Sequence, residues 1–120
     1  MSRDEATCVA DMVEACDRVM EYTAGLNAAS FRGDRKTIDA VVRNLEVLGE
    51  ASKRVSDRIR SQAPDVPWRE IAGLRDVLIH DYFGIDLDIV CDVALLKVPR
   101  LRCVLDDVLR LFGGPGTTKA

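Results

Sequence analysis

Apolar residues between positions 38 and 59 recur at steps of three and four, and this spacing constrains the fold more than any other feature of the chain. The spacing places their side chains on one face of an α-helix, which has to be buried against other helices. We predict a long helix that follows an N-cap at Asp34 and runs to about Gln62. Gly49 within the stripe predicts the close approach of another helix. The stripe consists of Ile38, Val41, Val42, Leu45, Leu48, Gly49, Ser52, Val55 and Ile59.

The N-terminal part of the chain predicts one further helix. Ser2 and Glu5 form a capping-box pattern, and apolar residues then follow at helical spacing over residues 3 to 24. Residues 25 to 33 are rich in small and polar residues, so they predict a connection with room for one helical turn.

The C-terminal half predicts a third helix and an interrupted final segment. Pro67 suits the first turn of a helix that stops at Gly84, and Asp86 or Asp88 caps the next start. Pro99 removes a backbone donor inside the last helical pattern, so we expect a kink or break there, with a fourth and a fifth helical piece.

These elements predict an all-α, up-down bundle. Alternation typical of strands is absent, and aromatic residues make up only 5% of the chain. A length of 120 residues suits one domain. We expect that domain to span residues 1 to 112, followed by a disordered tail over residues 113 to 120.

The charge balance argues against a protein held on nucleic acid by bulk electrostatics. The chain has 17 basic and 20 acidic residues and a formal net charge of -3. The segment from 32 to 75 is the net-positive part, so a local basic surface remains open. No apolar run is long enough for a membrane span and no signal peptide is recognisable, so we expect a soluble, cytoplasmic protein.

Cysteine and histidine usage limits the possible chemistry. Cys8, Cys16, Cys91 and Cys103 lack C-x-x-C spacing, so we interpret them as buried apolar side chains in a reducing compartment. His80 is the one histidine, which excludes metal sites that need two imidazoles from one chain. We expect no metal and no cofactor, and acid-base chemistry near neutral pH has to use His80 or perturbed carboxylates.

The third predicted helix combines this histidine with a central arginine. On a helical wheel of residues 68 to 83, Arg75 falls in the middle of a broad apolar arc, which marks an internal ion pair or a cleft at an interface. Asp76 and His80 are neighbours at the edge of that arc. On a straight helix Arg75 and His80 lie about 140° apart and about 7.5 Å along the axis. They can therefore meet one substrate atom only if the helix distorts before Gly84 or a second subunit contributes.

Two structural interpretations remain open for the same residues. Arg75 can form a salt bridge with a neighbouring helix, and His80 can cap carbonyls at the helix end. The apolar arc is wider than one partner helix needs, which favours a homodimer.

The segment around Arg75 and His80 resembles the signature of a known family. Residues 64 to 86 contain PWREIAGLRDVLIHDYFGID, which is similar to the signature of the HepT-like toxins of the HEPN ribonuclease superfamily. The similarity extends to AVVRNLEVLGEASK, residues 40 to 53, and to the helices around Pro99, so it covers the chain from about 22 to 112. Cys91 stands where the family commonly has a large aromatic residue.

The resemblance implies a HEPN-type four-helix bundle and a function. The family motif R-x-x-x-x-H-x-Y matches at Arg75, His80 and Tyr82, with Asp76 as the polar residue after the arginine. It implies a toxin of a toxin-antitoxin pair, a metal-independent endoribonuclease whose active site lies at a homodimer interface. It also implies that a partner nucleotidyltransferase, MntA, places AMP on Tyr82 and silences the nuclease.

In chemical terms, the resemblance makes His80 the general acid or base and Arg75 the phosphate clamp. RNA affinity has to come from local basic residues, Arg69 and Arg75, with Arg54, Arg58 and Arg60 as further candidates that are also compatible with solvated helix faces. The alternative function is a non-catalytic helical module that binds and regulates a nucleotidyltransferase. A cofactor-binding bundle has no ligand cluster to support it.

Overall fold

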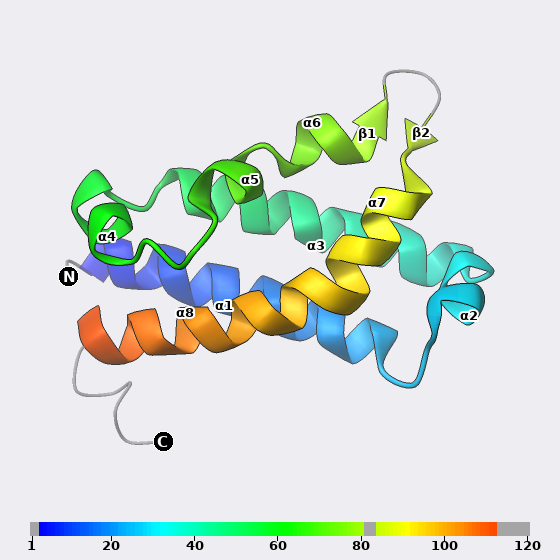
Figure 1. Ribbon diagram of the computed structural model, residues 1–120, viewed down its shortest axis with the longest axis horizontal. Coiled ribbons are helices and arrows are strands. Elements are labelled where there is room, and N and C mark those ends of the chain that lie inside the picture. Colours follow the sequence, from blue (N-terminus) through cyan, green and yellow to red (C-terminus); the bar gives the residue numbers. More distant parts are fainter. Residues whose placement is uncertain (1–2, 81–83, 113–120) are drawn as a thin grey trace.

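Two long helices, α1 (Arg3–Thr23) and α3 (Arg35–Lys53), lie antiparallel and pack along each other (Figure 1). The computed structural model describes residues 3–80 and 84–112. The predicted first helix is confirmed to within a residue, and Gly25 follows it with a positive φ of 79° that favours glycine. The disordered tail predicted over residues 113 to 120 lies outside the described residues.

The connection between these two helices has its own capped turn. The short helix α2 (Ala28–Arg32) begins after Asn27, whose side chain accepts a hydrogen bond from the Ser30 backbone N–H at 2.9 Å. The Asp34 carboxylate then accepts from the Thr37 N–H at 3.1 Å, which confirms it as the N-cap of α3.

The predicted continuation of the second helix to Gln62 is wrong. Helix α3 ends at Lys53, and a separate helix, α4 (Asp57–Gln62), begins after Ser56, whose hydroxyl accepts a hydrogen bond from the Ile59 N–H at 3.3 Å. Val55 and Ile59 are nevertheless 3% and 0% exposed. The apolar spacing predicted one helix because α3 and α4 both bury residues of the stripe, on either side of the break.

The predicted third helix is also interrupted. It consists of α5 (Trp68–Ala72) and α6 (Leu74–Leu78), which meet at Gly73, and the chain then becomes extended in β1 (Ile79–His80). β1 pairs antiparallel with β2 (Gly84–Ile85). The helix does not reach Gly84 because the Leu78 carbonyl accepts a hydrogen bond from the Asp86 N–H at 2.7 Å across the hairpin.

The final segment is helical throughout and changes type before Pro99. It consists of α7 (Leu87–Asp92), the π-helical η2 (Val93–Lys97) and α8 (Val98–Phe112). Pro99 has no N–H to give to the carbonyl one turn earlier, and the wider π turn precedes it with the Val98 N–H bonded to the Val93 carbonyl. The expected irregularity is therefore a π segment and not a gap. Asp86 caps α7 through the Ile89 N–H at 3.2 Å.

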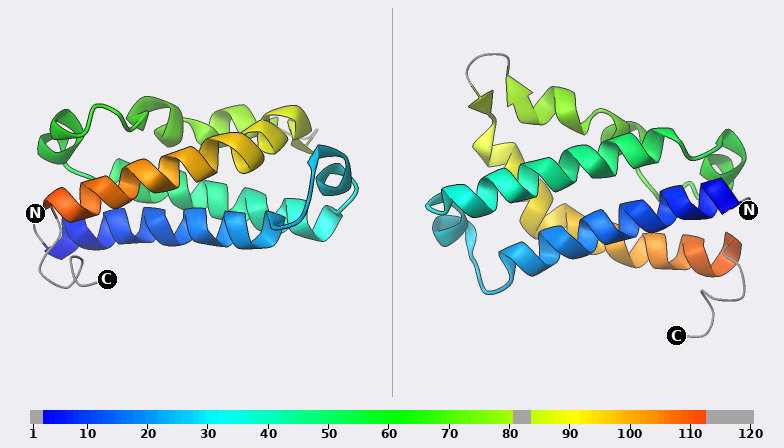
Figure 2. Two further views of the ribbon diagram at one scale, coloured as in Figure 1. Left: turned by 60° about the horizontal axis from the view of Figure 1, so that its bottom comes forward. Right: turned by 180° about the vertical axis from the view of Figure 1, so that it is seen from behind.

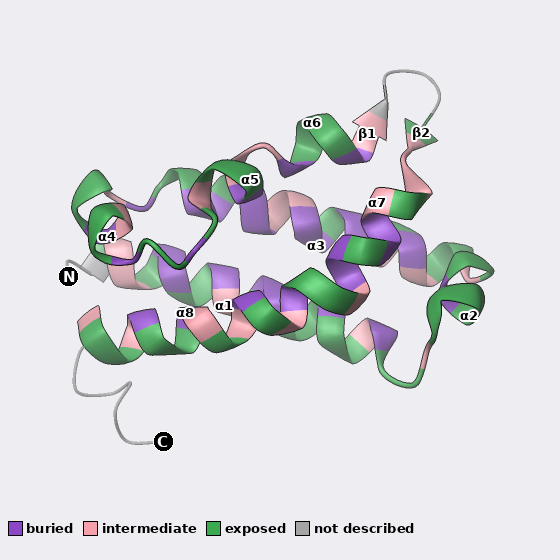
Figure 3. Cartoon of the chain, viewed as in Figure 1, coloured by how far each residue is buried: buried purple, intermediate pink, exposed green. Residues whose placement is uncertain are grey.

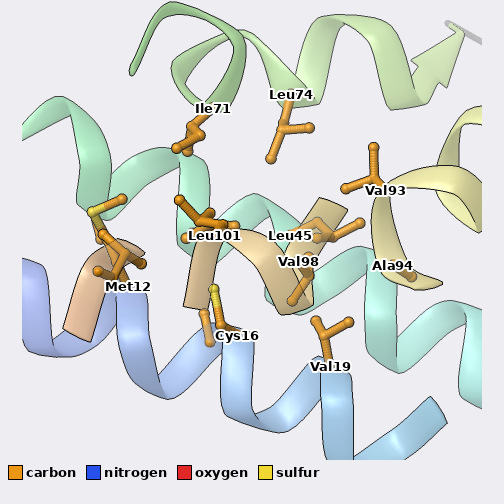
Figure 4. Packing of buried hydrophobic residues seen from close by; sticks show 14 of the residues in the cluster. Met12, Cys16, Val19, Leu45, Ile71, Leu74, Val93, Ala94, Val98 and Leu101 are labelled. Carbon is orange, nitrogen blue, oxygen red and sulfur yellow. The ribbon is translucent and has the colours of Figure 1, made fainter. Parts of the chain in front are cut away.

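The core lies between α1, α3 and α8 and is covered by α5, α6 and α7 (Figures 2 and 3). Figure 4 shows Met12, Cys16 and Val19 of α1 facing Leu45 of α3 and Leu101 of α8. Of the thiols, Cys8, Cys16 and Cys91 are buried as predicted, whereas the prediction for Cys103 is wrong because it is exposed on α8. Within the described ranges, no helix is long and apolar enough to cross a membrane.

Candidate active-site cleft

The position of Arg75 follows from the break at Gly73. Helix α6 buries Leu74 and Leu78, which are one turn apart and anchor it on the core. Arg75 follows Leu74 by about 100° around the helix, and its side chain is exposed. On a continuous helix, Arg75 falls at the centre of the apolar arc. The break at Gly73 separates α5 from α6, so the residues of the two helices do not share one helical wheel.

Arg75 lines a cleft of about 350 Å³ whose opposite wall is α3. In the right-hand view of Figure 2, α3 crosses between α1 and α6, which contribute Asp11 and Arg75 to this cleft, and α5 adds Ala72. The residues around it are Asp11, Arg43, Glu46, Val47, Gly49, Glu50, Ala51, Lys53, Arg54, Ala72 and Arg75.

Small residues lie between the charged ones. A Cβ atom at Gly49 would stand 3.0 Å from the Ile71 carbonyl oxygen, so glycine lets α5 approach α3 closely, as predicted. Ala51 and Ala72 also contribute little side-chain volume. The charged groups therefore surround an unobstructed surface.

The cleft carries cations that have no acidic partner among the described residues. Arg43, Arg54 and Arg75 are exposed, and within residues 3–80 and 84–112 none of their guanidinium groups forms an ion pair. Lys53 pairs with Glu50 at 3.3 Å. Three guanidinium groups are thus available to an anionic ligand.

His80 lies beyond the end of α6 and not on the helix. Its backbone pairs with Gly84 in the hairpin, and Gly84 has a positive φ of 86° that suits glycine. The straight-helix geometry that separated His80 from Arg75 therefore does not apply, because α6 ends at Leu78. Tyr82 lies outside the described residues.

The other predicted residues are distributed around α5 and α6. Asp76 is exposed on α6. Arg69 is exposed on α5 and lines a different, mostly apolar groove of about 330 Å³ between α5–α6 and the C-terminal helices. Arg69 and Arg75 therefore do not share a cleft.

Of the three further basic candidates, one belongs to the cleft. Arg54 lines it, whereas Arg58 pairs with Glu5 at 3.6 Å and Arg60 donates to the Ser52 carbonyl at 2.9 Å. The described part of the chain contains no group of three histidine, cysteine or acidic residues arranged to hold a metal ion.

Sequence reasoning missed the α3 side of the cleft. Arg43, Glu46 and Glu50 follow one another at three- and four-residue steps beside the apolar stripe, so they share a face of α3. That spacing was a usable signal.

The fold and the cleft define a small helical domain with an arginine-lined surface site. Residues 12–108 match the family described as ribonuclease HepT-like. "Probable ribonuclease HepT" of Thermococcus cleftensis is 37% identical, over 85% of this chain and 93% of that protein. "Putative RNase MJ0127" of Methanocaldococcus jannaschii is 35% identical, over 93% of each chain. No solved structure matches.

The chain therefore belongs to the ribonuclease HepT-like family, which confirms the resemblance in its sequence and agrees with the all-α, HEPN-type fold.

Proposed function

We propose that this protein is a metal-independent endoribonuclease of the HEPN class, the toxin of a toxin-antitoxin pair. The observation that carries the proposal is Arg75 of the family motif, which lines a cleft with two other arginines that have no ion-pair partner in the described ranges. The family match over residues 12–108 supports the reaction class. An RNA phosphate is the anion that such a cleft suits.

The reaction uses the nucleophile that RNA itself carries. The 2′-oxygen attacks the adjacent phosphorus, the bond from phosphorus to the 5′-oxygen breaks, and a 2′,3′-cyclic phosphate and a 5′-hydroxyl result. His80 takes the 2′-OH proton or gives a proton to the leaving oxygen. Arg75 stabilises the negative charge that develops on the phosphorane.

A homodimer supplies what one chain lacks. One reaction needs both a base and an acid, and each chain has one histidine. Two copies with their hairpins in one interface bring two imidazoles to one substrate. Asp76 supports His80 in this proposal, and Arg69 contacts RNA outside the Arg75 cleft.

In this proposal, modification of Tyr82 regulates the nuclease activity. A nucleotidyltransferase of the MntA type adds AMP to the Tyr82 hydroxyl, and the added phosphates compete with RNA for the same arginines. The alternative function is a helical module that binds and regulates a nucleotidyltransferase without cutting RNA. We expect the protein in the cytoplasm, where its RNA substrates are found.

Cleavage of RNA in the presence of a chelator tests the reaction. Wild-type protein should leave 2′,3′-cyclic phosphate ends, and Arg75→Ala and His80→Ala should each reduce the rate at least a hundredfold. Arg35→Ala is the matched control because Arg35 pairs with Asp39 at 3.5 Å and does not line the cleft. Equal activity in all variants would indicate a contaminating nuclease and defeat the catalytic assignment.

Mass spectrometry after incubation with the partner enzyme and ATP tests the modification. Tyr82→Phe should abolish the addition of AMP, whereas Tyr22→Phe, the change at the other tyrosine of the chain, should leave it intact. AMP addition to the Tyr82→Phe protein would refute Tyr82 as the acceptor. Modification without any nuclease activity in the unmodified protein would favour the non-catalytic module.

A further inference from the structure

Three acidic residues line the Arg75 cleft, Asp11, Glu46 and Glu50, and among the described residues none of them pairs with its arginines, since Glu50 pairs with Lys53. Glu46 lines the cleft from α3 and is half-buried, yet within the described ranges its carboxylate forms no ion pair or hydrogen bond. Asp11 of α1 also lines the cleft and forms no ion pair within those ranges, but its side chain is exposed, whereas that of Glu46 is half-buried. A half-buried carboxylate without a partner favours a ligand that offers hydrogen-bond donors.

A nucleotide combines the two kinds of group that this cleft is suited to bind. Its phosphate accepts from guanidinium groups, and its base presents N–H donors on the Watson–Crick edge when the RNA is single-stranded. Purely anionic ligands would be repelled by Glu46. A cleft with free groups of both signs therefore fits phosphate and base together.

We propose that Glu46 selects the base of the RNA nucleotide bound beside Arg75, and that it prefers guanine. This inference rests on the proposed ribonuclease function and adds its substrate preference. The N1–H and the amino group of guanine are adjacent donors that match the two oxygens of one carboxylate. Adenine and cytosine each present one amino group beside an acceptor. Uracil presents a single N–H donor flanked by two carbonyl oxygens, and these oxygens repel a carboxylate that approaches with both of its oxygens.

The dimensions of the cleft allow this arrangement. Arg54 directly follows α3 and lies about three helical turns from Arg43, about 16 Å along the axis, so the cleft extends beyond a single phosphate. Glu46 lies between them on α3. The cleft as a whole has a volume of about 350 Å³, in which a base can lie.

Binding of RNA that cannot be cleaved separates base selection from catalysis. The probes are short 2′-O-methyl uridine oligonucleotides with guanosine, inosine or uridine at one position, labelled with fluorescein for anisotropy. Inosine lacks only the amino group of guanine. We expect wild-type protein to bind the guanosine probe about tenfold more tightly than the uridine probe, with inosine in between.

The variant Glu46→Gln should lose that ratio, even if removal of a negative charge strengthens its binding to every probe. Glu21→Gln is the matched control because Glu21 undergoes the same chemical change on the exposed surface of α1, outside both the Arg75 cleft and the groove of Arg69. Circular dichroism establishes that both variants are folded. The decisive quantity is the ratio of affinities for guanosine and uridine probes.

The outcomes distinguish this inference from the proposed function. No base preference in the wild type, no binding, or an unchanged preference in Glu46→Gln would overturn the role of Glu46. If unmodified RNA is still cleaved in that case, the ribonuclease function stands without it. If the protein prefers guanosine probes through Glu46 but cleaves no RNA, the role of Glu46 is supported and the proposed ribonuclease reaction is refuted.

Discussion

A Cβ atom at Gly49 would lie 3.0 Å from the carbonyl oxygen of Ile71, so α3 and α5 meet where only glycine fits without movement. The Ile71 carbonyl also accepts a hydrogen bond from the Gly73 N–H, which holds it at the break between α5 and α6. The contact therefore links the floor of the cleft to the helix that carries Arg75.

Gly49→Ala should lower the free energy of unfolding by about 1 kcal/mol, because overpacking against a backbone atom outweighs the better helix propensity of alanine. Gly33→Ala is the control, since the nearest atoms to its Cβ would be 3.8 Å away at ordinary contact distance. Urea unfolding of both variants measures the difference. A Gly49→Ala protein as stable as Gly33→Ala would mean that α5 shifts freely.

Much of the bundle could be predicted because burial repeats at helical spacing. The caps at Asp34 and Asp86 and the close approach at Gly49 all follow from local chemistry. The breaks after Lys53 and at Gly73 could not be predicted from apolar spacing, since buried residues lie on both sides of each break, Ala51 and Val55 at the first and Ile71 and Leu74 at the second. Apolar spacing indicates which residues are buried. It does not reveal a short interruption between two helices that pack on the same core.

Of the residues that line the candidate site, the sequence predicted Arg75 of α6 but not the residues that face it from α3. Arg75 was identified from its unusual place among apolar residues, although the structure exposes it. The spacing of Arg43 and Glu46 shows only that they share a face of α3. Their place beside Arg75 comes from tertiary packing between segments far apart in the sequence. Arg69, close to Arg75 in sequence, lines another groove for the same reason.

RNA affinity should be weak and sensitive to salt. Three unpaired arginines that neutralise three phosphates of a single strand give a slope of log K against log salt near -2. Arg54→Ala should make the slope shallower by about 0.7, whereas Arg110→Ala should not, because Arg110 pairs with Asp107 on α8. Anisotropy titrations at several salt concentrations give the slopes. Equal slopes for both variants would place RNA outside the cleft.

Thiol reagents should distinguish one cysteine from the rest. Cys103 is exposed, whereas Cys8, Cys16 and Cys91 are buried. In the native protein, a chromogenic disulfide reagent should label about one thiol quickly, and the others should react only on unfolding. Cys103→Ser should remove the fast phase. A fast phase that persists in this variant would show that a buried thiol becomes accessible through local opening.

Alkaline conditions should destabilise the fold through Cys16. Burial, reinforced by the negative charge of Asp17, raises the pKa of this thiol from 9.0 to about 12. Above pH 9 the unfolded chain loses the proton while the folded chain retains it, so stability is fully present below pH 9 and falls toward pH 12. The slope of the free energy of unfolding against pH approaches about 1.4 kcal/mol per pH unit.

Urea unfolding measured between pH 8 and 11 tests this prediction. Cys16→Ala should flatten the decline in stability, whereas Cys103→Ser should not. Parallel curves for the wild type and both variants would exclude Cys16 as the cause.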